Sequence, residues 1–395
     1  MAINLSRNTR LWISTVNTGH NSSNTFEIPV QEGYSLTQSV GTADISAEEA
    51  GPVPTRGGKR FNTQLDPVEW SFSTYFNPYS ITDDSSETFK LTVDMLLWHS
   101  LASSSTTDTE FTDGAWDGVT AAGTSKVYGD STKFKVDFSN NNAHVLTELF
   151  MYFQIDNDVF LVEQAQVGQA EISIDISDIA QVAWSGNATK YTRLSAEPAF
   201  IAGGGVAYNE SAPIADRYAA IPANKVYLIN KLTTMSFQSD VSGTNLFYSV
   251  PITAGTVTIN NNVTYLTPNT LSEVDVPIGS FTGAFEVTGT LSAYLRYSAN
   301  AGTTAGEPKG TTNLLEDMQA NPGKVTNTTN VVMYIGGQAT GTPLVKITMP
   351  TTHVAVPTLS TDDIVSTEIE FKAIPTSADL ISGDEITIEM TDAQA

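Results

Sequence analysis

The chain carries an internal repeat, which constrains its architecture more than any other feature. Residues 26–33 (FEIPVQEG) return in the second half of the chain as residues 248–255 (YSVPITAG). Two further pairs keep the same order at nearly the same spacing: 72–76 (FSTYF) with 291–295 (LSAYL), and 96–97 (LL) with 314–315 (LL). Three matches at a nearly constant offset predict a duplicated domain.

The chain has 395 residues, which is enough for two domains that each bury a core. The repeat predicts a first domain at 1–200, a connection at 201–222 and a second domain at 223–395. Charged residues make up only 16% of the sequence, while Thr, Ser, Asn, Gly, Val and Ile dominate its long polar stretches. This composition favours strands and turns over helices, so a mainly β fold is predicted.

The formal net charge of −24 has two interpretations. It argues against a protein that wraps nucleic acid, because phosphate binding needs Lys and Arg to displace counterions. It is compatible with a surface that must repel DNA. It is also typical of an abundant protein that is simply kept soluble by its charge.

The sequence also limits the covalent chemistry and the compartment. It contains no cysteine, which excludes disulfides and thiolate metal sites. The first residues, 1–7 (MAINLSR), lack the apolar run of a signal peptide, and no stretch approaches the ~18–20 apolar residues of a membrane span. A soluble chain made in the cytosol is therefore expected.

Period-two alternation predicts most of the regular structure. In the first half we expect strands at 9–16, 34–40, 70–76, 133–138, 146–155, 159–166 and 170–176. A short apolar segment at 178–186 is expected to lead into a turn. A helix is predicted from its apolar spacing at 88–102, after the Asp83-Asp84-Ser85-Ser86 start signal, and a short helix is expected at 311–320.

Two segments of the first half stand out as irregular. Residues 43–69 hold prolines and glycines that argue against a compact hairpin, so a long loop is predicted there, and 103–131 is a polar insertion without a counterpart of equal length. Acids and bases are segregated along the loop, which suits docking onto another copy of the chain. The alternative is a solvated loop without a role. The candidate contact residues are Glu48, Glu49, Arg56, Lys59, Arg60 and Phe61.

The sequence offers no motif for catalysis or for a cofactor. The four histidines, at 20, 99, 144 and 353, have no metal-ligand spacing, and neighbouring carboxylates such as Asp362-Asp363 are expected by chance among 43 acids. Gly203–Gly205 lacks the G-K-[ST] of a phosphate loop, and no G-x-S-x-G elbow is present. We therefore predict no catalytic residue, no cofactor site and no metal site, and an enzyme is not favoured.

Several short patches are similar to one viral family. They lie at 263–271 (VTYLTPNTL), 277–283 (PIGSFTG) and 289–295 (GTLSAYL) in the second half, and at 42–45 (TADI), 70–75 (WSFSTY) and 179–186 (IAQVAWSG) in the first. In these patches and in its order of strands and helix, the chain resembles the tail tube proteins of long-tailed bacteriophages. The resemblance covers most of the chain, through motifs of moderate specificity.

The resemblance implies a β-sandwich or half-barrel flanked by one helix in each of two tandem domains. It also implies inner sheets that join into a ring, and rings that stack into a virion tail tube through which DNA passes without specific binding. The family's usual ring holds six single domains, so two domains per chain predict a trimer. Loop 43–69 becomes the candidate stacking contact. The implied partners are further copies of the chain and the sheath, baseplate and tail-terminator proteins.

A second class of protein also fits the composition. A β-rich adhesin, decoration protein or surface-layer protein shares the low charge, the abundant threonine and the duplicated β domains, but the absent signal peptide argues against it. A polysaccharide-degrading tail enzyme ranks third.

Overall fold

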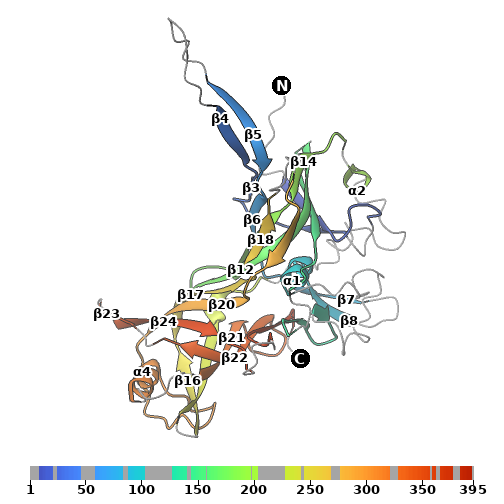
Figure 1. Ribbon diagram of the computed structural model, residues 1–395. Coiled ribbons are helices and arrows are strands. Elements are labelled where there is room, and N and C mark those ends of the chain that lie inside the picture. Colours follow the sequence, from blue (N-terminus) through green and yellow to red (C-terminus); the bar gives the residue numbers. More distant parts are fainter. Residues whose placement is uncertain are drawn as a thin grey trace, which may run out of the picture.

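The computed structural model shows a protein built mainly from antiparallel strands (Figure 1). It describes residues 9–20, 25–45, 58–82, 88–102, 127–139, 144–156, 158–196, 198–202, 227–241, 244–267, 276–320, 328–355, 358–361, 365–376 and 383–393. The predicted mainly β fold is confirmed. Most of the predicted connection 201–222 and of the insertion 103–131 lies outside these residues.

The first half forms two connected runs of strands. One run has the order β2-β1-β11-β12-β14 and the other the order β12-β13-β6-β3. The long strand β12 belongs to both runs. The bounds are β1 (Thr9–Ser14), β2 (Thr25–Ile28), β3 (Ser35–Thr37), β6 (Val68–Tyr75), β11 (Leu149–Ile155), β12 (Asp158–Asp175), β13 (Gln181–Ala188) and β14 (Lys190–Arg193).

The second half repeats this pairing order with its own strands. Its runs are β16-β15-β21-β22-β25 and β22-β24-β20-β17, and β23 adds to the outside of β24. The bounds are β15 (Thr234–Val241), β16 (Thr244–Val250), β17 (Ile252–Asn260), β20 (Glu286–Tyr294), β21 (Thr328–Gly336), β22 (Leu344–Val354), β23 (Thr358–Thr361), β24 (Val365–Ala373) and β25 (Thr387–Thr391).

The repeated sequence motif occupies corresponding places in these two sets. Strand β2 ends immediately before Pro29 and β16 immediately before Pro251, because proline has no N–H to continue a ladder. Beyond the prolines, the Gln31 N–H and the Thr253 hydroxyl each donate to a serine carbonyl of the neighbouring strand, at 2.9 and 3.1 Å. These acceptors are Ser73 of β6 and Ser292 of β20, which occupy equivalent positions in the repeated pair 72–76 and 291–295.

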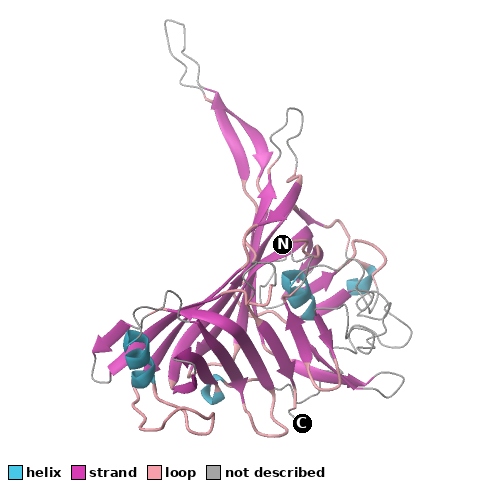
Figure 2. Ribbon diagram, turned by 60° about the horizontal axis from the view of Figure 1, so that its bottom comes forward, coloured by secondary structure: helices cyan, strands magenta, loops and turns pink. Residues whose placement is uncertain are grey.

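Strands β12 and β17 join the two halves into one continuous sheet. They pair antiparallel from Gln169↔Asn260 to Asp175↔Ala254. The resulting order is β3-β6-β13-β12-β17-β20-β24-β23, which we call the joined sheet (Figures 1 and 2). Alternate residues of its strands, such as Trp184, Ile172 and Leu291, are fully buried on one side of this sheet.

Elements of the first half also pair with the run β16-β15-β21-β22-β25 of the second half. Strand β10 (Phe134–Asp137) pairs with β25 on one side and with β9 (Val127–Gly129) on the other. Lys133 forms an ion pair with Glu389, and Lys90 forms one with Asp392 at 2.5 Å. The two halves therefore share sheets and ion pairs.

The helix predicted at 88–102 is wrong over its first part. Residues Thr88–Thr92 form strand β8, which pairs with β7 (Pro78–Thr82), and α1 spans only Met95–Ala102. A β-branched residue opens and closes β8, and the neighbouring strand supplies ladder hydrogen bonds that local helix propensity cannot match. By contrast, α4 (Thr311–Ala320) begins and ends at the predicted residues.

Two strand predictions were also wrong in their boundaries. The strands expected at 159–166 and 170–176 are one strand, β12, whose register shifts between Val167 and Gln169 where it passes from one run to the other. The segment expected at 178–186 to lead into a turn contains most of β13, which lies between β12 and β6. The flanking strands β12 and β6 supply the ladder hydrogen bonds of β13, and neither partner can be read from the segment itself.

The loop predicted at 43–69 is a hairpin over the part that the structure describes. Strands β4 (Val40–Ile45) and β5 (Lys59–Leu65) pair antiparallel, and the prolines that argued against a hairpin lie at 52 and 54, outside the described residues. We call this hairpin the arm, because it projects from one end of the molecule (Figures 1 and 2). The shorter hairpin of β18 (Val263–Leu266) and β19 (Gly279–Thr282) occupies the corresponding place in the second half.

Candidate assembly surfaces

The joined sheet presents one polar face that runs across both halves. The residues between its buried positions form rows through the strand registers. One such row consists of Ser73, Ala183, Glu171, Thr258, Thr288 and Lys372, and the next consists of Tyr75, Gln181, Ser173, Thr256, Thr290 and Glu370. Hydroxyl and carboxylate side chains dominate these rows, so the face is suited to contact with water rather than to packing.

Carboxylates dominate the charge of this face. Over the described strands, its charged side chains are Glu69, Glu171, Asp175, Glu286, Glu368, Glu370 and Lys372. The single lysine forms an exposed ion pair with Glu286 at 2.8 Å, and this hydrogen bond lowers the pKa of that carboxyl. Five carboxylates therefore remain without a compensating cation on the face, which makes its field strongly negative.

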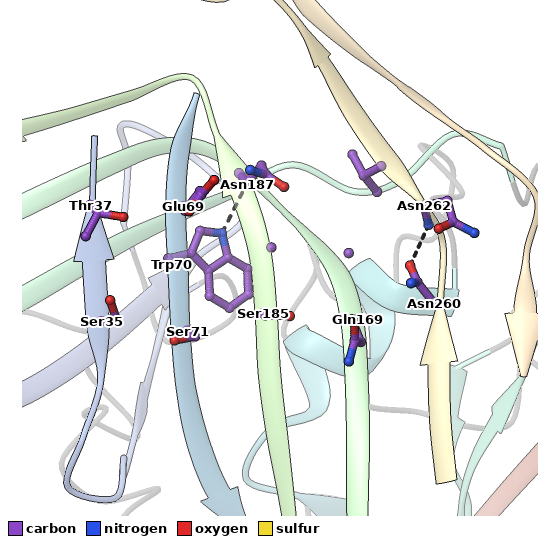
Figure 3. Close-up of a pocket in the computed structure, with 13 residues that line it drawn as sticks. Ser35, Thr37, Glu69, Trp70, Ser71, Gln169, Ser185, Asn187, Asn260 and Asn262 are labelled. Carbon is purple, nitrogen blue, oxygen red and sulfur yellow. Dashed lines mark hydrogen bonds between the residues drawn. The ribbon is translucent and has the colours of Figure 1, made fainter. Parts of the chain in front are cut away.

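A shallow cavity of about 430 Å³ lies on the polar face where the first half meets the second (Figure 3). Its walls come from β3, β6, β13, β12 and β17, and Glu69 is its only charged lining residue in the described part of the chain. Trp70 Nε1 donates to the Asn187 carbonyl at 3.3 Å, and Asn262 N donates to Asn260 Oδ1 at 2.7 Å. The lining offers hydrogen-bonding groups but no nucleophile paired with a base.

The arm carries the described part of the predicted stacking residues. Lys59, Arg60 and Phe61 all lie exposed on β5, whereas Glu48, Glu49 and Arg56 lie outside the described residues. Arg60 pairs with Asp44 of the same hairpin, with nitrogen–oxygen distances of 2.6 and 3.0 Å. This pairing lowers the pKa of Asp44 and raises that of Arg60.

The cross-strand register gives the arm two chemically different faces. Ala43 lies opposite Phe61 and Ile45 opposite Lys59, so these side chains share one face, while the Asp44–Arg60 pair lies on the other. Ile45 and Phe61 are each 52% exposed. Two large apolar side chains exposed on a projecting hairpin are typical of a surface that another molecule covers.

The sequence reasoning missed a second candidate surface, on the β18–β19 hairpin. Leu266, Ile278 and Phe281 are each more than half exposed there, and no charged residue occurs in either strand. The signal in the sequence was an uncharged apolar cluster next to a proline.

Two of the histidines, His20 and His99, lie in packed surroundings. His20 lies between Ser14 and Tyr152 at 3.2 and 3.1 Å, and its burial lowers its pKa. His99 is buried in α1 beside Thr147, at 3.1 Å. Among the residues that the structure describes, no group of three His, Asp or Glu side chains could hold a metal ion. Within the same residues, none of the helices combines the length and the hydropathy that a membrane-spanning helix needs.

These features define a class of protein. It is a β-rich structural subunit whose sheet is continuous across two similar halves and whose exposed hairpins are suited to contact with further copies. No protein-family model matches the chain. The chain is 40% identical over 386 residues to the "Tail tube protein pb6" of Escherichia phage T5, a match that covers 98% of this chain and 75% of that protein.

At this identity and coverage, the chain belongs to the tail tube proteins of bacteriophages. It is a structural component of the virion tail, which assembles with copies of itself into a tube and contacts other tail components.

Proposed function

We propose that three copies of this chain form each ring of the tail tube, and that the ring has approximate sixfold symmetry because each chain holds two similar tube domains. The repeated pairing order of the two halves supports a duplication. So does the place of the repeated motif, before a proline that ends β2 in one half and β16 in the other. Three duplicated chains supply as many domains as six single-domain chains do.

The polar face of the joined sheet lines the channel in this arrangement. The observation that carries this assignment is the run of five unneutralised carboxylates across both halves of one continuous sheet. DNA phosphates are repelled by such a surface, so the genome slides past without binding specifically. The chain acts as a passive conduit and not as an enzyme.

The arm forms the contact between successive rings. Identical rings that stack in one direction bring opposite ends of the subunit together, as any head-to-tail contact does. The arm projects from one end of the molecule (Figure 2) and presents Ile45 and Phe61 on one face. Residues 40–65 hold three acids and three bases, so the arm carries no formal net charge. It can therefore approach a strongly acidic neighbour with little net repulsion.

Electron microscopy of the purified protein tests these assignments together with native mass measurement. The wild-type chain is expected to form stacked rings with a central hole, each with the mass of three 42.3 kDa chains. Deletion of 47–60 is expected to leave folded rings that do not stack. A matched deletion of the exposed residues 303–306 should stack normally.

Three results contradict the proposal in different ways. Six chains per ring would refute the trimer, and normal tubes from the arm deletion would refute the stacking contact. For the channel lining, replacement of Glu171, Glu368 and Glu370 by lysine is expected to make assembled tubes retain double-stranded DNA at low salt. Unchanged DNA retention would place this face elsewhere than in the channel.

A further inference from the structure

Each edge strand of the joined sheet has a partner on one side only in the described part of the chain. Among the described residues, β3 pairs only with β6, and β23 pairs only with β24. Neither edge carries the charged residues or prolines that normally prevent edge-to-edge association. Their sequences are Ser-Leu-Thr for β3 and Thr-Leu-Ser-Thr for β23.

The edge strand β23 also exposes an apolar side chain. Leu359 is 53% exposed, and Val365 at the start of the adjacent β24 is 41% exposed. In contrast, Leu36 at the centre of β3 is only partly exposed and packs against the core. A leucine at the centre of an uncharged edge strand is typical of a strand that gains a partner on assembly.

The junction inside the chain shows what such an edge looks like when it is covered. There Ile172 of β12 lies opposite Val257 of β17, and both side chains are fully buried. Ser173 lies opposite Thr256, and Glu171 opposite Thr258, on the polar face.

Strand β23 holds the place next to β24 that β12 holds next to β13. In the first half, Ser73 pairs with Ala183, and Ala183 pairs with Glu171. In the second half, the corresponding Ser292 pairs with Glu368, and Glu368 pairs with Thr358. By continuation along the strands, Leu359 corresponds to Ile172 and Ser360 to Ser173.

Strand β3 likewise holds the place next to β6 that β17 holds next to β20. Leu36 lies opposite Trp70, as Val257 lies opposite Gly289. The spacing that relates Phe72 to Leu291 also relates Trp70 to Gly289. Leu36 therefore corresponds to Val257, and Ser35 to Thr256.

We propose that β23 of one copy pairs antiparallel with β3 of the next copy in the register of the internal junction. Leu359 then lies opposite Leu36, Ser360 opposite Ser35 and Thr358 opposite Thr37 of the neighbouring copy. The pairing buries Leu359 as Ile172 is buried, satisfies the backbone groups of both edges and continues the polar face from chain to chain. This register rests on the proposed ring, since only a closed ring covers every edge.

The absence of cysteine allows a clean disulfide test of this register. Directly opposed residues of an antiparallel pair have Cα atoms about 4.5–5.5 Å apart, within the range that a disulfide spans, whereas a shift of two residues along the strand exceeds it. The variant Ser35→Cys/Ser360→Cys is expected to crosslink on mild oxidation of assembled protein. The shifted control Ser35→Cys/Thr358→Cys is expected to show at most one tenth of that yield.

The crosslinked products separate the register from the proposed ring. On a non-reducing gel, a ladder that ends at three chains supports both, and one that ends at six supports the register but refutes the trimer. Crosslinking that is equal in the shifted control, or absent while microscopy shows tubes, overturns the register.

A second measurement covers the case in which the cysteine variants do not assemble. Leu359→Asp is expected to lose rings while its urea unfolding midpoint matches that of the wild type. Normal rings from Leu359→Asp would overturn the proposed pairing.

Discussion

Two cross-strand pairs occupy corresponding positions in the two halves of the joined sheet, but the large side chain lies on a different strand in each pair. In the first half, Trp70 of β6 lies opposite Gly186 of β13, whereas in the second half Gly289 of β20 lies opposite Phe371 of β24. In each pair the aromatic ring covers the glycine: a Cβ on Gly186 would meet the Trp70 ring, and one on Gly289 would meet Phe371. The pairing of one large with one small residue is kept while its direction is reversed.

This reversal teaches what the repeated fold requires at these positions. The sheet needs one large and one small partner in each pair, because cores tolerate substitution when the total volume is kept. It does not need the large residue on a particular strand. A search for similar residues at a fixed offset therefore finds Phe72 and Leu291 but misses the aligned Trp70 and Gly289.

Removal of either aromatic ring is expected to have the largest effect on stability. Trp70→Ala and Phe371→Ala should each lower the free energy of unfolding by about 3–5 kcal/mol, because each leaves a cavity over a glycine that cannot fill it. Urea unfolding of the unassembled chain measures this free energy. Tyr294→Ala, on the exposed polar face, is the control and should change the free energy of unfolding by less than ~0.5 kcal/mol. A loss equal to that of the control would show that the aromatic rings do not stabilise these cross-strand pairs.

The next largest effect is expected from comparing the internal junction, where β17 covers β12, with the open edge strand β23. Ile172→Ala is expected to cost about 2–5 kcal/mol, since this side chain is fully buried in the internal junction. Leu359→Ala, at the corresponding open position, should cost less than ~0.5 kcal/mol in the unassembled chain. Equal losses in urea unfolding would mean that β23 is already covered within one chain.

The buried acid of the first half provides a pH-dependent test. Burial raises the pKa of Asp94 to about 6, although Thr92 and Thr74 donate to it at 2.6 and 3.3 Å. The spacing that relates Leu96 to Leu314 places Thr312, which carries no charge, at the corresponding position in the second half. A carboxyl with a raised pKa stabilises the fold below pH ~4, and this contribution is lost as the pH rises through 6.

Replacement of this acid should therefore remove part of the pH dependence. The stability of Asp94→Asn relative to the wild type is expected to increase by about 2 kcal/mol between pH 4 and pH 7. Urea unfolding at four pH values in this interval measures the difference, in which the contributions of all other carboxyls cancel. A difference that does not change with pH would show that Asp94 titrates normally.

The two glycines should respond differently to one added methyl group. Gly186→Ala and Gly289→Ala are each expected to cost about 1–3 kcal/mol through overpacking. The nearest obstacle is the Gln166 carbonyl oxygen at Gly186 but the Phe371 ring at Gly289. Phe371→Leu should therefore relieve part of the cost of Gly289→Ala, whereas Trp70→Leu should not relieve Gly186→Ala. Double-mutant cycles measure this, and equal coupling in both pairs would contradict the assignment.

Features that depend on local pattern were predictable from the sequence. The mainly β fold follows from composition, α4 from the apolar spacing of 311–320, and the ends of β2 and β16 from prolines that cannot donate to a ladder. These properties belong to short segments, so the physical reasons for them are present in the chain itself.

Features that depend on distant partners were decided only by the tertiary structure. Strand β8 replaced the first part of a predicted helix because β7 supplies its ladder, and β13 formed at 181–188 because β12 and β6 flank it. Alternation predicted that Glu171 and Ile172 point to opposite faces of the sheet, but not which of the two faces is exposed to solvent. That depends on which strands lie beside them, because burial is a property of the packed sheet rather than of the residue.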